Sequence, residues 1–146
     1  MSLSLLIVNV GELLRRPFVA MNLMWSKSVK TILIVDDDPA TIELTRRRLE
    51  STGAYAVFTE SRGSCAVEAA RKCKPDLILL DILMPDMLGS EVAAAVHEDP
   101  ALTHIKVIYL TSMLKAGEEQ KSGENVIIGK PVRTEELLAI VAQELH

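Results

Sequence analysis

Aspartates end two of the apolar runs in this chain. Asp36 to Asp38 directly follow the run Ile32–Val35, and Asp81 ends the run "LILLD". Two carboxylates about 4 Å apart repel by roughly 4 kcal/mol at an effective dielectric constant of about 20. A hard divalent cation, which takes oxygen ligands and keeps several waters, would offset that repulsion. Lys130, at the end of the run "VIIGK", offers a second positive charge.

The elements that carry these residues follow a regular pattern. Short apolar, β-branched runs alternate with helical patterns, which predicts a doubly wound α/β domain with a parallel sheet covered by helices on both faces. In such a sheet, ligand sites form at the carboxyl ends of the strands, where the strand order reverses. Asp36, Asp37 and Asp81 are therefore expected to be neighbours there. Thr111, at the end of "VIYLT", adds a hydroxyl group to the same edge. The predicted strands begin near Thr31, Ala54, Leu77, Lys106 and Asn125.

Helix boundaries are marked less evenly along the chain. Asp38 before Pro39 is typical of a helix N-cap, so we interpret Asp38 as a cap and not as a metal ligand. Thr134 is expected to cap the last helix. The interval Ser112–Glu124 lies where the fourth helix belongs, yet it is mostly polar, contains Gly117 and Gly123, and has no apolar stripe. We expect a short or mobile helix there.

Composition excludes several classes of function. The chain has 146 residues, 49% of them apolar, and a formal net charge of -4, which argues against a nucleic-acid surface because phosphate binding needs clustered basic residues. Cys65 and Cys73 are eight residues apart and match neither a redox pair nor a zinc site. Free thiols in a reducing, cytoplasmic setting are therefore expected.

The first 28 residues differ from the rest. Their longest uncharged run, Met1 to Gly11, is too short to span a bilayer, and the arginines follow the apolar stretch where a secretory signal would place them before it. Residues 1–28 are interpreted as an extension. One interpretation is an artefact of an upstream start codon, with the natural start at Met21 or Met24. The other is an amphipathic arm that packs on a neighbouring protein. A membrane role is the least favoured interpretation. Residues 29–146 form the predicted domain.

The segments "ILIVDDDP", "DLILLDILMPDMLG", "VIYLTS" and "GKP" together resemble the receiver domain of two-component response regulators. The resemblance runs from about Val29 to Leu145, and the spacing from Asp37 to Asp81 matches the family. It implies a flavodoxin-like fold with strand order 2-1-3-4-5.

The same resemblance implies roles for individual residues. Asp81 would be the phosphoacceptor. Asp36, Asp37, Asp81 and the backbone carbonyl of Leu83 would hold Mg²⁺ or Mn²⁺, with Asp36 acting through water. Thr111 would hydrogen-bond the phosphoryl oxygens, Lys130 would pair with them, and the Lys130–Pro131 peptide would be cis.

The sequence also departs from the family pattern. Ile127 stands where the family often has an aromatic residue that follows the Thr111 hydroxyl in the switch, and the interval from Thr111 to Lys130 is short. Leu83 and Met113 occupy positions that are often polar, and we expect them to shield the phosphoryl group from water and slow its hydrolysis. The alternative is that both side chains only pack at the surface.

Three functions remain open on the sequence. The leading one is a phosphorylation-dependent switch, which receives its phosphoryl group from a histidine kinase or phosphotransfer protein and then docks a separate output protein. Such a switch catalyses only its own phosphorylation and dephosphorylation. The second is a phosphorylation-independent adaptor, favoured by the unusual Ser112–Glu124 interval. The third, a phosphohydrolase, is disfavoured because Leu83 replaces the second aspartate of such enzymes. The output partner stays unknown and a homodimer is left open.

Overall fold

The computed structural model describes residues 28–146, and the predicted extension lies almost entirely outside the described residues. The described part has a six-stranded sheet in the order β2-β1-β3-β4-β6-β5. Its elements are β1 (Lys30–Val35), α3 (Pro39–Glu50), β2 (Tyr55–Glu60), the 3₁₀ turn η1 (Gly63–Cys65), α4 (Ala66–Cys73), β3 (Leu77–Asp81), α5 (Gly89–Glu98), β4 (Lys106–Thr111), β5 (Glu119–Ser122), β6 (Asn125–Gly129) and α6 (Thr134–Leu145).

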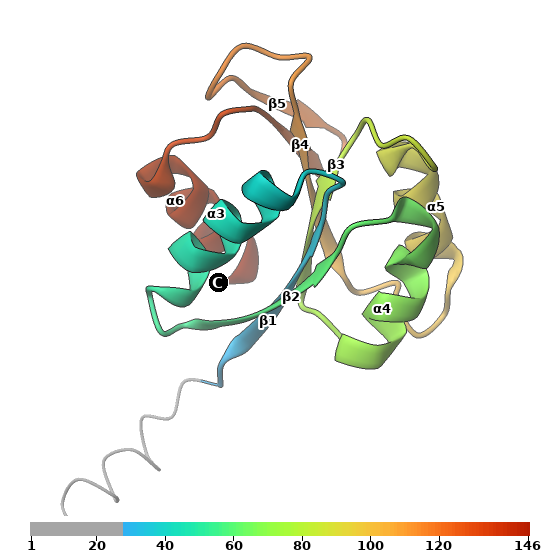
Figure 1. Cartoon of the computed structure of the whole chain (residues 1–146). Coiled ribbons are helices and arrows are strands. Elements are labelled where there is room, and N and C mark those ends of the chain that lie inside the picture. The colour runs from blue at the N-terminus through green and yellow to red at the C-terminus, as the bar shows by residue number, and fades with distance from the viewer. Residues whose placement is uncertain (1–27) are drawn as a thin grey trace, which may run out of the picture.

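Helices cover both faces of the sheet (Figure 1). Helices α3 and α6 pack on one face, and α4 and α5 pack on the other. Side chains alternate between the faces along each strand, so Ile32 and Ile34 of β1 join the α3–α6 core while Leu33 and Val35 join the α4–α5 core. All five residues of β3 are buried, as expected of a central parallel strand. The predicted α/β class and the order of the five parallel strands are confirmed.

The interval Ser112–Glu124 departs from the prediction. It contains no helix; instead Glu119–Ser122 forms strand β5, which pairs antiparallel with β6 and adds a sixth strand at the edge. Gly123 has a positive φ of 62° and, with Glu124, forms the two-residue connection between Ser122 and Asn125. The prediction of a short or mobile fourth helix is therefore wrong. A tight turn at Gly123 brings the polar segment onto the edge of β6, where its backbone is paired and its side chains stay in water.

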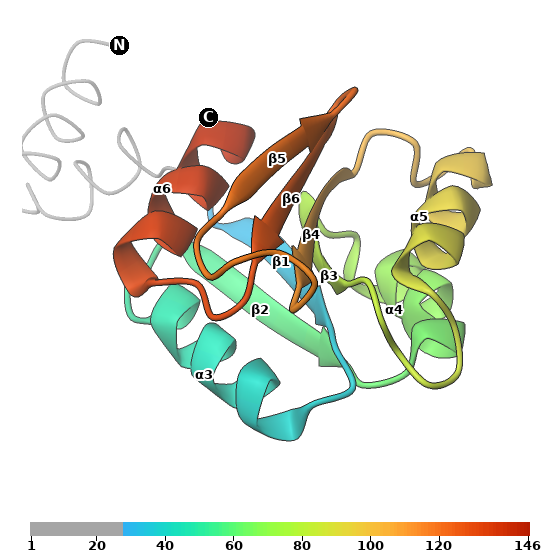
Figure 2. The ribbon, with the colours of Figure 1, turned by 90° about the horizontal axis from the view of Figure 1, so that it is seen from above.

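The loss of this helix leaves part of the sheet uncovered. In Figure 2 the α4–α5 layer lies beside β1 and β3 and reaches β4, where Val107 is buried in the α4–α5 core, but no helix of the described residues covers the same face of β6 and β5. Tyr109 and Ile127 lie on that face and are only half-buried. One smaller expectation also fails: Thr134 is the first residue of α6 and Arg133 is its N-cap.

Candidate functional site

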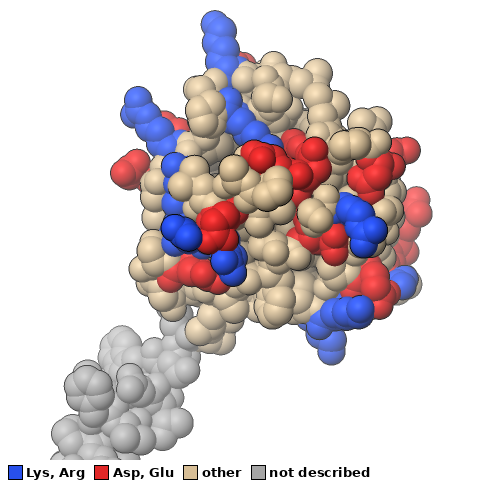
Figure 3. Space-filling view, viewed as in Figure 1, with Lys and Arg blue, Asp and Glu red and all other residues tan. Residues whose placement is uncertain are grey.

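Four strand ends meet at one edge of the sheet. Asp36 follows β1, Asp81 ends β3, Thr111 ends β4 and Lys130 follows β6. Figure 3 shows acidic side chains gathered at this edge, with basic side chains beside them. Parallel register places the ends together, because Val35 pairs with Leu80 and Thr111 pairs with Gly129. The structure therefore brings together the residues that the sequence predicted as neighbours.

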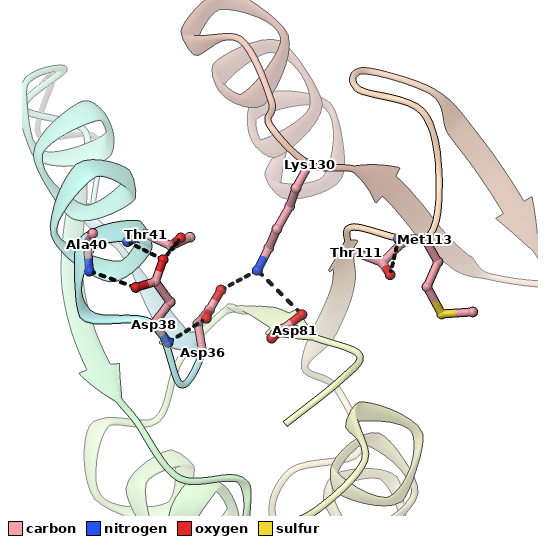
Figure 4. A network of polar contacts seen from close by, with 8 residues as sticks. All are labelled: Asp36, Asp38, Ala40, Thr41, Asp81, Thr111, Met113 and Lys130. Carbon is pink, nitrogen blue, oxygen red and sulfur yellow. Dashed lines mark hydrogen bonds and ion pairs between the residues drawn. The ribbon is translucent and has the colours of Figure 1, made fainter. Parts of the chain in front are cut away.

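The ammonium group of Lys130 lies between two carboxylates (Figure 4). Its Nζ is 2.6 Å from Asp36 Oδ2 and 3.4 Å from Asp81 Oδ1. The Asp36 side chain is only 2% exposed and that of Asp81 10%, so the pairing is shielded from solvent. Asp36 also accepts a hydrogen bond from the backbone N–H of Asp38 at 2.9 Å. Both oxygens of Asp36 are thus engaged by protein groups.

The carboxylates form a cluster suited to a hard cation. One oxygen from each of Asp36, Asp37 and Asp81 lies within 4.8 Å of the others. Asp37 is exposed while the other two are buried, so the cluster opens to solvent on the Asp37 side. Three carboxylate oxygens with room for water are the donor set that Mg²⁺ and Mn²⁺ prefer. The residues fit such an ion, with Asp37 and Asp81 best placed to bind it directly. Leu83 lies two residues beyond Asp81, and a role for its backbone carbonyl stays a prediction.

Electrostatic effects in the cluster oppose one another. Burial raises the pKa of Asp81 above its ordinary value, the Lys130 ammonium pulls that pKa down, and neighbouring Asp36 pushes it up again. For Lys130, burial lowers the pKa, but the hydrogen bond and attraction to Asp36 and the charge of Asp81 outweigh it, so the Lys130 pKa lies above its usual range. The lysine therefore remains charged at neutral pH.

Thr111 is buried beside the cluster, and its hydroxyl oxygen already accepts one hydrogen bond. Its Oγ1 accepts a hydrogen bond from the backbone N–H of Met113 at 3.1 Å. Met113 is 69% exposed and its side chain points away from Asp81 in Figure 4, and Leu83 is 50% exposed. Met113 thus lies near the site through its backbone, and its side chain does not cover the carboxylate in this state. The expected shielding by Leu83 and Met113 stays a prediction.

Asp38 serves as a helix cap, as predicted. Its side chain accepts from the backbone N–H groups of Ala40 and Thr41, each at 3.3 Å, and from the Thr41 hydroxyl. The hydrogen bond from Thr41 is the main reason that the pKa of Asp38 lies below its ordinary value. Of the three consecutive aspartates, only Asp36 and Asp37 face the cluster. The Lys130–Pro131 peptide is cis, as the resemblance implied.

Two supporting residues escaped the sequence analysis. A Cβ at Gly89 would overlap the carbonyl oxygen of Asp81 and lie 2.9 Å from the Ile82 Cα, so only glycine lets α5 start against the end of β3. A Cβ at Gly129 would likewise overlap the carbonyl oxygen of Lys115. The signal was present, because Gly89 ends the quoted run "MPDMLG" and Gly129 precedes Lys130, but neither glycine was given a packing role.

Comparisons with known proteins agree with this geometry. Residues 32–142 match the family model of the response regulator receiver domain. The chain belongs to this family. The receiver domain is 35% identical over 106 residues to the polar-differentiation response regulator DivK of Brucella anthropi, covering 70% of this chain and 85% of that protein, and 36% identical over 106 residues to DivK of Brucella ovis.

Solved structures show the same relationship. The receiver domain superposes on the chemotaxis protein CheY4 of Vibrio cholerae with a TM-score of 0.69 at 26% identity, covering 81% of this chain and 100% of that one. A CheY-like receiver domain protein of Methanospirillum hungatei gives a TM-score of 0.67 at 29% identity, covering 81% and 94%. The resemblance inferred from the sequence motifs is confirmed, and with it a role in two-component signalling. Within residues 28–146, no helix combines the length and the apolar character needed to cross a membrane.

Proposed function

We propose that this receiver domain accepts a phosphoryl group on Asp81 from the phosphohistidine of a kinase or phosphotransfer protein, with Mg²⁺ or Mn²⁺ bound, and then presents an altered surface to an output protein. An Asp81 oxygen attacks phosphorus, a P–O bond forms, the P–N bond breaks, and the imidazole leaves with the bonding electron pair and takes up a proton. The observation that carries this proposal is the position of Lys130 between Asp36 and Asp81, beside the three-carboxylate cluster. The half-buried free cysteines fit a reducing compartment, and we place the protein in the cytoplasm.

Each side chain has a defined task in this transfer. A bound divalent cation supplies charge neutralisation for the carboxylates and the phosphoryl oxygens. Lys130 can turn from Asp36 toward a phosphoryl oxygen because its ammonium already lies 3.4 Å from Asp81. The Thr111 oxygen accepts from the N–H of Met113, so its own O–H is free to donate to the phosphoryl group. Asp81 is thus the nucleophile, and the other two residues stabilise the incoming charge.

Phosphorylation would add negative charge to this network. It adds a charge of about -1.5 to -2 beside Thr111 and Lys130 if the acyl phosphate is charged like a phosphoester. Both residues connect directly to the β5–β6 hairpin. The N–H of Lys130 donates to the Thr111 carbonyl at 2.7 Å, and Gly129 exchanges hydrogen bonds with Gly117 and Glu118 at 3.0 and 2.9 Å. A displacement of Thr111 or Lys130 is therefore expected to move the interval Ser112–Glu124.

Amide hydrogen exchange tests the switch against the adaptor alternative. With Mg²⁺ and the phosphoryl mimic beryllofluoride, we expect exchange to change across Ser112–Glu124, because that interval is anchored to Thr111 and Gly129. Ile127 should change little, since no aromatic ring on β6 is available to follow the Thr111 hydroxyl. The Asp81→Asn variant is the control and should show no change. An exchange pattern indifferent to beryllofluoride would favour the phosphorylation-independent adaptor, and a change at Ile127 alone would contradict the proposed route.

The lifetime of the phosphoryl group gives a second expected result. Leu83 and Met113 cannot orient a water molecule for attack on phosphorus, so the acyl phosphate should be long-lived. Replacing Leu83 with Asn and Met113 with Glu should speed hydrolysis by about tenfold, which corresponds to roughly 1.4 kcal/mol of barrier. Loss of radiolabelled phosphate at saturating Mg²⁺ measures this, with Leu83→Ile and Met113→Leu as the matched apolar control. Equal rates in the polar variant and the parent protein would show that both side chains merely occupy the surface.

A further inference from the structure

The outer side of β5 is an unpaired sheet edge within residues 28–146. The four residues of β5, Glu119–Ser122, pair only with β6 and are all exposed. Figure 2 shows the hairpin at the border of the sheet, away from the helices of the α4–α5 layer. An edge strand presents free N–H and C=O groups that can pair with another strand.

The hairpin register determines which backbone groups face outward. The Gly129 N–H donates to the Glu118 carbonyl, and Gln120 lies opposite Ile127. Because antiparallel pairs alternate between hydrogen-bonded and non-hydrogen-bonded, the carbonyl of Glu118 and both backbone groups of Gln120 point toward β6. Glu119 and Lys121 therefore direct theirs outward. A strand added to this edge must place its own outward-facing residues opposite these two.

A second copy of the chain meets this requirement through a two-fold axis. Residues whose backbone groups point outward in one copy must lie opposite such residues in the other copy. An antiparallel pairing centred on β5 therefore has three possible registers. One places Glu119 opposite Glu119 of the second copy, and another places Lys121 opposite Lys121. Both bring like charges together, which destabilises a cross-strand pair. The third places Glu119 opposite Lys121 of the second copy, and the symmetry repeats this contact.

We propose that two copies of this chain associate edge to edge through β5, in the register that pairs Glu119 of each copy with Lys121 of the other. Each such pair exchanges both backbone N–H···O bonds. The two charged contacts lie on the α6 face, because Glu119 is opposite Ile128 of the α3–α6 core. Gln120 lies on the axis beside its symmetry mate. It shares the opposite face with Ile127, where no helix of the described residues limits the space.

The charge pattern favours self-association over pairing with an unrelated strand. Charged residues on an edge strand normally discourage pairing. Here the charges alternate so that only one self-complementary register is attractive. The contact is small compared with the roughly 1,200–2,000 Å² that stable interfaces bury, so the dimer should be weak and reversible. It should become populated in the high-micromolar range of protein concentration.

A charge-swap cycle tests the register. Sedimentation velocity over a concentration series, with the full chain and without any phosphoryl donor, should show a monomer–dimer equilibrium. Lys121→Glu and Glu119→Lys should each weaken dimerisation by about tenfold, because two attractive pairs become repulsive. The double variant Glu119→Lys, Lys121→Glu should regain the affinity of the parent protein. Lys72→Glu on α4, which is 75% exposed and distant from β5, is the matched charge control and should leave dimerisation unchanged.

Amide exchange at single-residue resolution supplies the second readout. As concentration rises, the amides of Glu119 and Lys121 should become protected, while Gln120, already directed to β6, should not change. Protection of Gln120 in each variant verifies that the hairpin is intact. The proposal is overturned by a protein that stays monomeric to millimolar concentration, by a dimer unaffected by Lys121→Glu, or by a double variant that does not recover. Because no phosphoryl donor is present, these outcomes are independent of the proposed function.

Discussion

Replacing Asp37 with Ala should abolish Mg²⁺-dependent phosphorylation of Asp81, whereas Asp36→Ala should slow it less. Asp37 is the exposed member of the carboxylate cluster and is open to a hydrated ion, while both oxygens of Asp36 are held by Lys130 and the Asp38 N–H. Loss of a direct ligand should lower the rate by about a hundredfold or more, or roughly 2.7 kcal/mol of barrier. Loss of a supporting residue should cost about tenfold. Phosphorylation by acetyl phosphate over a range of Mg²⁺ concentrations measures both.

The third aspartate of the run provides the control. Asp38 caps α3 and does not belong to the cluster. Asp38→Ala should therefore reduce the free energy of unfolding by about 1 kcal/mol, as loss of an N-cap does, and leave the dependence of phosphorylation on Mg²⁺ intact. If Asp38→Ala impaired phosphorylation as severely as Asp37→Ala, or if Asp37→Ala still responded to Mg²⁺, the assignment of ligands would be wrong.

Replacing Lys130 with Met should destabilise the protein and make its stability depend on Mg²⁺. The change removes the only ammonium group that contacts Asp36 and Asp81 among the described residues, so two buried carboxylates repel each other without compensation. We expect the free energy of unfolding to fall by about 1–3 kcal/mol in the absence of metal, the range for a buried polar group left unpaired. A divalent cation should restore much of this loss, because it replaces the missing positive charge.

Urea unfolding with and without Mg²⁺ measures the effect of Lys130→Met. Lys72→Met, which removes an exposed lysine on α4, is the matched control and should change stability by less than about 0.5 kcal/mol. Phosphorylation of the Lys130 variant should also be slow even when Mg²⁺ restores its stability, because the ammonium contacts the phosphoryl oxygens. A Lys130→Met protein as stable as the Lys72 variant, or one indifferent to Mg²⁺, would refute the role given to the lysine.

The parallel strands could be predicted because each is a short apolar run with a polar residue at its carboxyl end. In β1 and β3 the burial is nearly continuous, and Asp36 and Asp81 mark where each strand reaches the sheet edge. Once the strand order was inferred, the proximity of Asp36, Asp81 and Lys130 followed from parallel pairing. The direction of the Met113 side chain could not be inferred, because it depends on the loop after β4 and not on strand register.

The hairpin was missed because β5 carries no hydrophobic alternation. The run "EQKS" is fully exposed, and the edge of β6, not burial of its own side chains, holds it in the sheet. A signal was nevertheless present. The sequence Ser122-Gly123-Glu124-Asn125 has glycine first in a two-residue connection, which is typical of a hairpin turn. Giving this turn more weight than the expected fourth helix would have predicted the sixth strand.

The most direct test of the central claim is the intact mass of the full chain after incubation with acetyl phosphate. With Mg²⁺, the parent protein should gain the mass of one phosphoryl group, and Asp81→Asn should gain none. Chelation of the metal should abolish the gain in the parent protein. Urea unfolding of Asp81→Asn verifies that the variant is folded. A phosphoryl group that still appears on Asp81→Asn, or that forms equally well without a divalent cation, would contradict the assignment of Asp81 as the metal-dependent phosphoacceptor.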